Sequence, residues 1–271
     1  YRATLPNGIR LIIKENHAAP VVALRAVFLG GTRFEAPENS GISNFVAEML
    51  TKGTVKRGAL EIAREIESMA GKLGGFSGQN SLGVSGEFLS RNLDRGLEIL
   101  AEILLQPNFD PEELEKKRQD ILAAIKRRED NLSTVAFNLF ARTLFLQHPY
   151  RFPVLGESNT ISAITRDELV EYYERHCVPG NLVLAIVGDV DPHAAASNVE
   201  HLFASMHPKP LAAPEIQAEP PLEAVRESVE HKDKAQAHIV LGFQGAKVTS
   251  PDRYPLEVLN AVLSGQGGRL F

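Results

Sequence analysis

The sequence has little sulfur, and its apolar residues form no long runs. It contains one cysteine, Cys177, and no tryptophan among 271 residues. A single thiol excludes an intramolecular disulfide and a zinc site built from several cysteines. No apolar run approaches the ~20 residues that a membrane-spanning helix needs. The sequence therefore predicts no membrane span.

An excess of charge of one sign is also missing. The 29 basic and 34 acidic residues are interspersed and give a formal net charge of −5. Because no basic block is present to follow a phosphate backbone, nucleic acid is not an expected partner. With 44% hydrophobic residues, the chain can bury one full core and begin another, since domains usually run to about 100–200 residues.

The spacing of apolar residues predicts the fold class. Apolar and polar residues alternate over the first thirty positions, which indicates antiparallel strands. The period then becomes helical, with an apolar stripe at Ile42, Phe45, Val46, Met49 and Leu50. Asp110 and Pro111 supply the cap and first residue of a long helix that should end near Glu129, and residues 182–187 read as a buried strand. We expect an α+β fold with a mostly antiparallel sheet covered by helices.

A cluster of prolines predicts the domain boundary. Five prolines between His207 and Leu222 exclude regular structure and favour an extended tether. We therefore expect a first domain at residues 1–206, a linker at 207–222, and the start of a second domain at 223–271.

The second domain is expected to resemble the first. The order of residues around Phe243-Gln244-Gly245 matches that around Phe28-Leu29-Gly30, at an offset of about 215 residues. This weak internal repeat predicts a homologous second copy, of which about fifty residues are present.

The first predicted helix carries the spacing of a known catalytic motif. Asn44, Ala47 and Glu48 share one helix face, the i, i+3, i+4 arrangement with which a His-x-x-Glu-His helix holds zinc and activates water. The segment from Gly41 to Thr54 strongly resembles the pitrilysin, insulinase and mitochondrial processing peptidase family of inverted-motif zinc peptidases. In that family, positions 44, 47 and 48 would be His, Glu and His.

Other ordered segments extend this resemblance over essentially the whole chain. They are Phe28–Arg33, Gln106–Phe109, His148–Tyr150 with Leu155-Gly156, and Pro179–Asn181 with Val187–Val190. The resemblance implies a metallopeptidase-like domain present as two homologous copies, the second incomplete here.

The same resemblance implies a vacated zinc site. The family's third ligand is a glutamate about 75 residues further on, and the residue 76 positions after Glu48 is Ala124. Catalytic zinc needs three nitrogen or oxygen ligands and an open position for water. Asn44 and Ala124 offer an amide and a methyl group, Ala47 cannot act as a general base, and Glu48 is expected to be a solvated helix carboxylate. No metal or other cofactor is therefore expected, although zinc is the family's metal.

The histidines, the cysteine and the first glycine cluster are expected to have structural roles and no catalytic role. The eight histidines include no pair at i, i+4 with a Glu between, and we expect them on the surface or the tether. Cys177 should be a buried thiol beside a helix end. The glycines from Gly71 to Gly78 follow a helix and precede a strand, so a helix-ending turn is expected instead of a nucleotide loop.

One glycine-rich segment has two readings. Residues 263–271 resemble the glycine-rich segment that family members carry after the first helix of their second half, and this implies a substrate-binding role for Gly265, Gly267, Gly268 and Arg269. A flexible helix exit accounts for the glycines equally well.

The resemblance implies a non-catalytic, zinc-peptidase-like subunit. It is expected to pair with an active zinc-bearing family member as a heterodimer, or with itself as a homodimer, and to help enclose an unfolded peptide. Two alternatives remain: an active zinc metalloendopeptidase with non-standard ligands, and an architectural subunit of the kind found as core proteins of a respiratory complex. An exported compartment such as the bacterial periplasm is expected over the cytoplasm, by resemblance to two-subunit bacterial relatives.

Overall fold

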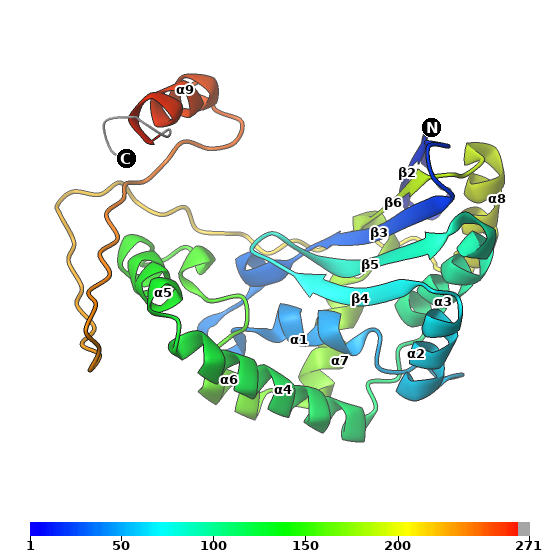
Figure 1. Ribbon diagram of the computed structural model, residues 1–271, viewed down its shortest axis with the longest axis horizontal. Helices are drawn as coiled ribbons and strands as arrows, with labels where there is room; N and C mark the ends of the chain where they lie inside the picture. Colours follow the sequence, from blue (N-terminus) through cyan, green and yellow to red (C-terminus); the bar gives the residue numbers. More distant parts are fainter. Residues whose placement is uncertain (265–271) are drawn as a thin grey trace.

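A six-stranded mixed sheet forms the centre of the computed structural model, which describes residues 1–264. The strand order is β1-β2-β6-β3-β5-β4 (Figure 1). The strands are β1 (Arg2–Thr4), β2 (Arg10–Glu15), β3 (Val21–Leu29), β4 (Lys72–Ser77), β5 (Ser81–Leu89) and β6 (Leu182–Gly188). Only the β2–β6 pair is parallel among these strands. The predicted mostly antiparallel sheet is confirmed.

Helices cover one face of this sheet. The helices within residues 1–264 are α1 (Ile42–Met49), α2 (Ala59–Ser68), α3 (Leu93–Leu105), α4 (Pro111–Glu129), α5 (Leu132–Leu144), α6 (Ser158–Ala163), α7 (Arg166–His176), α8 (Pro192–Leu202) and α9 (Arg253–Ser264). The last of these, α9, contributes no buried residue and lies apart from the sheet (Figure 1). Along β3, Val22, Leu24, Ala26 and Phe28 are buried, while the alternate residues face away and are largely exposed. Figure 1 shows α1, α4 and α7 on the same side of the sheet. Within the described residues, no helix combines the length and the apolarity needed to cross a membrane.

The helix α1 lies between the sheet and the outer helices. All five residues of its predicted apolar stripe are buried, and Phe45 is 0% exposed. Beyond the end of the helix, Gly53 has a φ of +132°, a conformation that residues with a Cβ rarely adopt. The predicted helix is therefore confirmed, and a glycine follows shortly after its end.

The long helix α4 also begins and ends where its residues predict. The carboxylate of Asp110 accepts hydrogen bonds from the backbone N–H groups of Glu112 and Glu113, at 2.9 and 3.1 Å. Pro111 is its first residue, and Glu129 is its last.

The glycine cluster at residues 71–78 is not a helix-ending turn. Residues 72–77 form β4, which pairs with β5. A Cβ on Gly75 would lie 1.9 Å from the carbonyl oxygen of Ala47, because the backbone of β4 lies directly against α1. The glycine therefore serves close packing of backbone on backbone, which the sequence pattern did not reveal.

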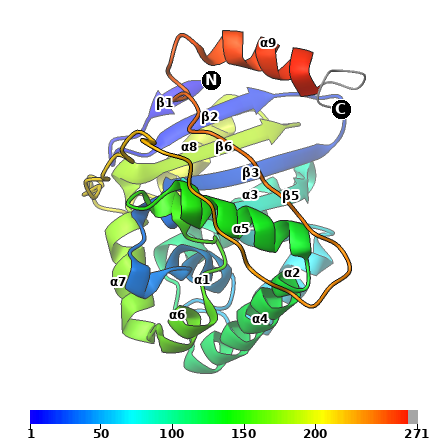
Figure 2. The same cartoon turned by 90° about the vertical axis from the view of Figure 1, so that its left-hand side faces the viewer.

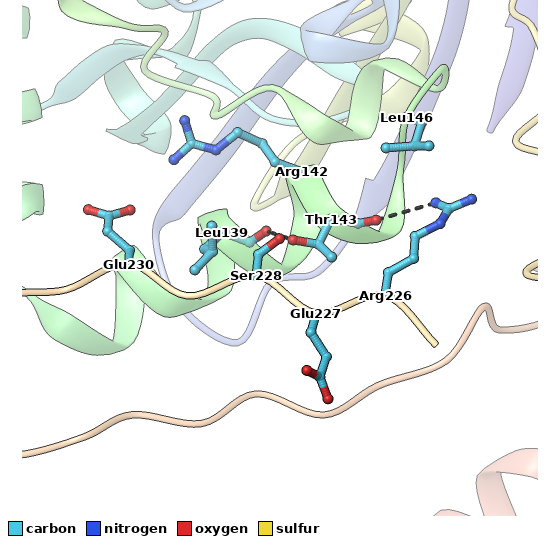
Figure 3. A pocket seen from close by; sticks show the side chains of 8 residues that line it. All are labelled: Leu139, Arg142, Thr143, Leu146, Arg226, Glu227, Ser228 and Glu230. Atoms are coloured by element: carbon cyan, nitrogen blue, oxygen red, sulfur yellow. Dashed lines mark hydrogen bonds between the residues drawn. The ribbon is translucent and has the colours of Figure 1, made fainter. Parts of the chain in front are cut away.

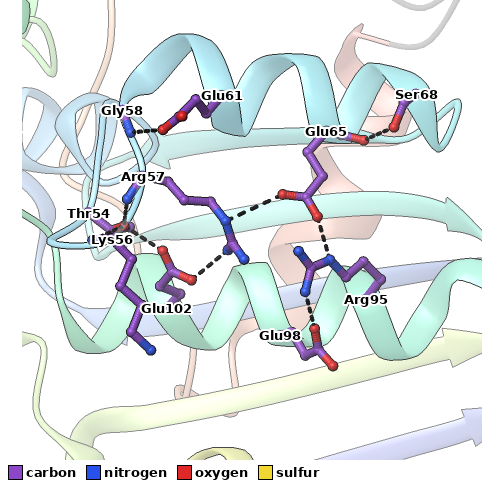
Figure 4. Close-up of polar contacts among 10 residues, drawn as sticks. All are labelled: Thr54, Lys56, Arg57, Gly58, Glu61, Glu65, Ser68, Arg95, Glu98 and Glu102. Atoms are coloured by element: carbon purple, nitrogen blue, oxygen red, sulfur yellow. Dashed lines mark hydrogen bonds and ion pairs between the residues drawn. The ribbon is translucent and has the colours of Figure 1, made fainter.

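A chain of ion pairs joins α2 to α3 (Figure 4). Arg57, in the loop before α2, lies 3.4 Å from Glu65 of α2 and 2.5 Å from Glu102 of α3. Arg95 of α3 also pairs with Glu65. Networks of this kind hold partly exposed helices in register more effectively than isolated surface pairs do.

Residues 207–252 contain neither helix nor strand, as expected for a proline-rich tether, although the irregular segment is longer than predicted. The next helix, α9, overlaps the place given by the internal repeat: the limits of α1 shifted by 215 residues are 257 and 264, and α9 ends at 264 but begins at 253. The predicted division into residues 1–206, 207–222 and 223–271 remains a prediction.

The packing of α1 yields a stability prediction. Phe45→Ala should lower the free energy of unfolding by about 3–5 kcal/mol, because a fully buried ring is replaced by a cavity. Phe137→Ala is the matched control: this ring on α5 is 62% exposed, and its loss should cost less than about 1 kcal/mol. Denaturant melts measure both values. Equal effects would mean that α1 does not hold the core.

Candidate functional site

The candidate site begins on α1, where the sequence predicts the vacated motif. Asn44 is 8% exposed and Ala47 is fully buried. Glu48 is the one residue of α1 that is not buried, and 37% of its side chain is exposed. The three residues thus occupy one wall, and only the carboxylate reaches solvent.

The second wall is α4, which contributes a cation. Lys117 and Ala124 share a face of α4, because seven residues span about two helical turns. Ala124 is half-buried and presents only a methyl group. The Nζ of Lys117 lies 3.2 Å from Glu48 Oε2 and 3.3 Å from Asp120 Oδ2. The exposed edge of the motif is therefore closed by an ion pair between α1 and α4.

The charge of Lys117 is sustained by its neighbours. Burial by itself lowers the pKa of this ammonium, but the charge of Glu48 and hydrogen bonds to Glu48 and Asp120 outweigh that effect. The pKa of Lys117 therefore lies above its ordinary value, and the side chain is a cation at neutral pH.

Glu35 fixes the other end of α1. Its Oε2 accepts a hydrogen bond from the N–H of Gly41 at 2.8 Å, and its Oε1 accepts one from the N–H of Ser43 at 3.1 Å. These N–H groups belong to the start of α1 and would otherwise lack partners. Burial raises the pKa of Glu35 to about 7, although the same hydrogen bonds lower it. Sequence reasoning missed both Glu35 and Lys117.

A hydrogen bond and a stacked pair connect α1 to α7. The hydroxyls of Ser43 and Tyr172 lie 2.6 Å apart. The ring of His176 stacks on Tyr172 with centroids 4.1 Å apart, and its Nδ1 is 2.9 Å from the Tyr172 carbonyl oxygen. His176 is buried, so the prediction that the histidines lie on the surface or tether was wrong for this residue, which faces inward from the last turn of α7.

Neither His176 nor its neighbour is prepared for catalysis. Burial lowers the pKa of the His176 imidazole and raises the pKa of the Cys177 thiol, so both groups are held neutral. Cys177 is a buried thiol beside the end of α7, as predicted. Both side chains act as packing groups in the core.

A metal-binding constellation is not found in the part of the chain that the structure describes. Within residues 1–264, no three side chains of His, Cys, Asp or Glu are grouped so that they could hold a metal ion. The predicted substrate-binding residues Gly265, Gly267, Gly268 and Arg269 lie outside the described residues.

A pocket of about 610 Å³ lies elsewhere, between α5 and the irregular segment (Figure 3). Its lining residues are Leu139, Arg142, Thr143, Leu146, Arg226, Glu227, Ser228 and Glu230. One wall is fixed by Arg226, which donates hydrogen bonds to the carbonyl oxygens of Thr143 and Leu144 at 3.3 and 3.0 Å. The lining mixes charges of both signs without a nucleophile and its base, so we assign no chemistry to this pocket.

The irregular segment is fastened near this pocket by Glu219. The Glu219 carboxylate accepts hydrogen bonds from the N–H groups of Leu146, Gln147 and His148, at 2.9, 2.9 and 3.0 Å. Arg226 lies 3.6 Å from the same carboxylate, whose side chain is 6% exposed. The tether is therefore anchored to the end of α5.

The arrangement of sheet, α1 and α4 corresponds to a known protein family. The family model described as "Insulinase (Peptidase family M16)" matches residues 10–158, and the model described as "Peptidase M16 inactive domain" matches residues 163–271. The chain belongs to peptidase family M16. The second match includes β6, which lies between β2 and β3 in the six-stranded sheet, so the limits of the two matches do not coincide with a break in the fold.

The names of similar proteins describe both peptidases and subunits of larger complexes. An uncharacterized zinc protease, YmxG of Bacillus subtilis, is 30% identical over 100% of this chain and 65% of its own length. A probable mitochondrial-processing peptidase subunit beta of Arabidopsis thaliana is 27% identical over 96% of this chain and 49% of its own. Human cytochrome b-c1 complex subunit 1 is 27% identical over 96% and 54%. The chain thus spans less than two thirds of these relatives.

A solved structure shows the same fold. The peptidase M16 inactive domain from Pseudomonas fluorescens superimposes with a TM-score of 0.85, at 20% identity, over 100% of this chain and 66% of that one. The fold expected from the resemblance is confirmed.

The residues at the site do not fit the zinc that the names of relatives imply. Position 44 carries a neutral amide and position 124 a methyl group. The remaining oxygen donor, Glu48, is already paired with an ammonium. Zinc bound at catalytic sites needs three nitrogen or oxygen ligands that converge, and this site offers one that is occupied by another cation.

Burial of Glu35 yields a pH prediction. Between the ordinary pKa of 4.5 and the raised value of about 7, the folded protein holds a proton that the unfolded chain releases. The free energy of unfolding should therefore fall as the pH rises through this window, by about 3–4 kcal/mol at most, and then level off. Urea melts across pH 4–8 measure it.

Glu35→Gln is the control for this slope, because it removes the titrating proton and keeps one acceptor oxygen. The difference between the two proteins cancels the contribution of other titrating groups. Identical pH profiles would show that folding does not shift the pKa of Glu35.

The anchored tether yields a proteolysis prediction. Glu219→Ala should speed cleavage within residues 207–252 by about tenfold, because three backbone N–H groups lose their acceptor. Glu223→Ala, an exposed position in the same segment, is the control and should leave the rate unchanged. Limited proteolysis followed by mass spectrometry measures the rates. Equal cleavage rates in the two variants would show that Glu219 does not anchor the segment.

Proposed function

We propose that this chain is a non-catalytic subunit of a zinc peptidase of the M16 family. The observation that carries the proposal is the ion pair between Glu48 and Lys117. It lies at position 48, where the family resemblance implies a zinc ligand. Ala47 stands where a general base would be needed, and its methyl group cannot accept a proton. Hydrolysis would then depend on an active, zinc-bearing family member paired with this chain as a heterodimer, or a homodimer would serve binding alone.

A peptide-binding role is supported by the edge of the sheet. Strand β4 is the last strand in the sheet order and, within residues 1–264, pairs only with β5. A free edge can accept an extended peptide as an additional strand, through backbone hydrogen bonds that do not depend on sequence. Because β4 lies directly against α1, such a peptide would run beside the candidate site (Figure 1).

An architectural role is the second candidate. It is supported by the similarity to human cytochrome b-c1 complex subunit 1, whose name places it in a complex with other subunits. The two candidates differ in one measurable property, because a peptide-processing subunit binds an unfolded peptide and a purely architectural subunit does not.

The proposal predicts that the chain alone retains no stoichiometric zinc and hydrolyses no unfolded peptide. Elemental analysis after dialysis against a weak chelator measures the metal, and a quenched-fluorescence peptide measures hydrolysis. The same peptide should bind, with an anisotropy change. Adding a zinc-bearing family member should produce hydrolysis that exceeds that of the partner alone.

Each departure from these results has a distinct meaning. One zinc per chain together with chelator-sensitive hydrolysis would establish the alternative of an active metallopeptidase with non-standard ligands. Absence of peptide binding would favour the architectural role.

A further inference from the structure

Lys117 differs from the adjacent lysine of α4 in its burial and in its partner. Its side chain is 15% exposed and reaches across to α1, whereas that of the adjacent Lys116 is 66% exposed and pairs with Glu113 of its own helix, at 2.7 Å. Ordering a long side chain costs conformational entropy, so a lysine held between two helices needs a specific partner. Its partner on α1 is Glu48, in the position of the family motif.

We propose that Lys117 is a built-in cation that occupies the vacated metal site, links α1 to α4 through Glu48, and excludes divalent metal from this site. Two features would then exclude metal from this site. Positions 44, 48 and 124 lack the ligands that zinc needs, and the ammonium of Lys117 places a positive charge where the metal would bind.

The geometry supports exclusion by charge. Zinc lies about 2 Å from its ligand atoms. A metal held by a side chain at position 48 would therefore lie within about 5 Å of the ammonium, which is 3.2 Å from the present carboxylate oxygen. A single and a double positive charge at that separation repel each other strongly in a partly buried setting, and salt screens buried charges only weakly.

Restoring the ligands alone should therefore recover only weak binding. The triple variant Asn44→His, Glu48→His, Ala124→Glu supplies three ligands but leaves Lys117 in place. Adding Lys117→Gln to it removes the charge and retains a side chain of similar polarity. We expect the quadruple variant to bind Zn²⁺ at least about tenfold more tightly than the triple variant. Isothermal titration calorimetry with zinc chloride, in the full chain, measures both affinities.

Lys116→Gln in the triple background is the matched control, since it removes the same charge one residue away and faces solvent. It should leave the affinity within about twofold of the triple variant, because an exposed charge is screened. Circular dichroism of each protein verifies that all of them are folded.

Every other outcome overturns the inference. Equal affinity in the triple and quadruple variants would show that Lys117 does not exclude metal, and an equal gain from Lys116→Gln would show a general charge effect. If neither folded variant binds zinc, the three positions do not converge, and geometry instead of Lys117 excludes the metal. The inference rests on the proposed function in one respect: both take positions 44, 48 and 124 as former zinc-ligand positions that no longer bind metal. Hydrolysis by the unaltered chain would count against that function and leave the comparison of variants intact.

Discussion

The burial of α1 is the constraint on which the rest of the structure depends. The helix has eight residues, and seven of them are buried. A helix this short is not stable by itself, so its neighbours must hold it. They do so with the backbone of β4 at Gly75, with α4, and with Tyr172 of α7. A helix that starts inside a core also needs acceptors for its first N–H groups, and Glu35 supplies two.

The frame of the site is therefore independent of any metal. Zinc fingers fold only when the metal gathers their ligands, because they have little core of their own. Here the positions of α1 and α4 follow from buried apolar side chains such as Phe45 and Ile121, whereas Glu48 remains partly exposed. Replacing the side chain at position 48 therefore removes little packing. Loss of metal-binding chemistry is thus compatible with retention of the fold, which makes a non-catalytic relative physically reasonable.

The sequence predicts features that depend on local pattern. The apolar stripe of α1, the limits of α4 and the buried strand at residues 182–187 follow from periodicity and capping, since each is determined by residues near one another in the chain. The resemblance locates the positions of the vacated motif. Patterns of this kind carry no information about distant partners, however.

The features that were missed arise from such distant partners. Gly75 is needed because Ala47 lies against it. His176 is buried because its ring packs against the rings of Tyr172 and Phe34, the second of which is distant in the sequence. Lys117 has its role because Glu48 lies on another helix. One signal was accessible: residues seven apart share a helix face, so the position of Ala124 pointed to Lys117 as a neighbour in the site.

Apolar side chains in the irregular segment and in α9 are exposed, because no sheet or helix within residues 1–264 packs against them. Val225, Val229, Ile239, Leu241 and Phe243 are each more than 80% exposed, and the last three occur at strand-like alternation. On α9, Leu256 and Leu259 are also 43% and 50% exposed, although the corresponding face of α1 is buried. Residues 1–264 supply no counterparts of β4, α4 and α7 for this second set. A second sheet related to the first would bury these side chains, and exposure of so many apolar groups to water is unfavourable without one. Burial of an apolar face against a sheet holds α1 in place. The same need to bury apolar side chains favours the predicted second copy of the domain.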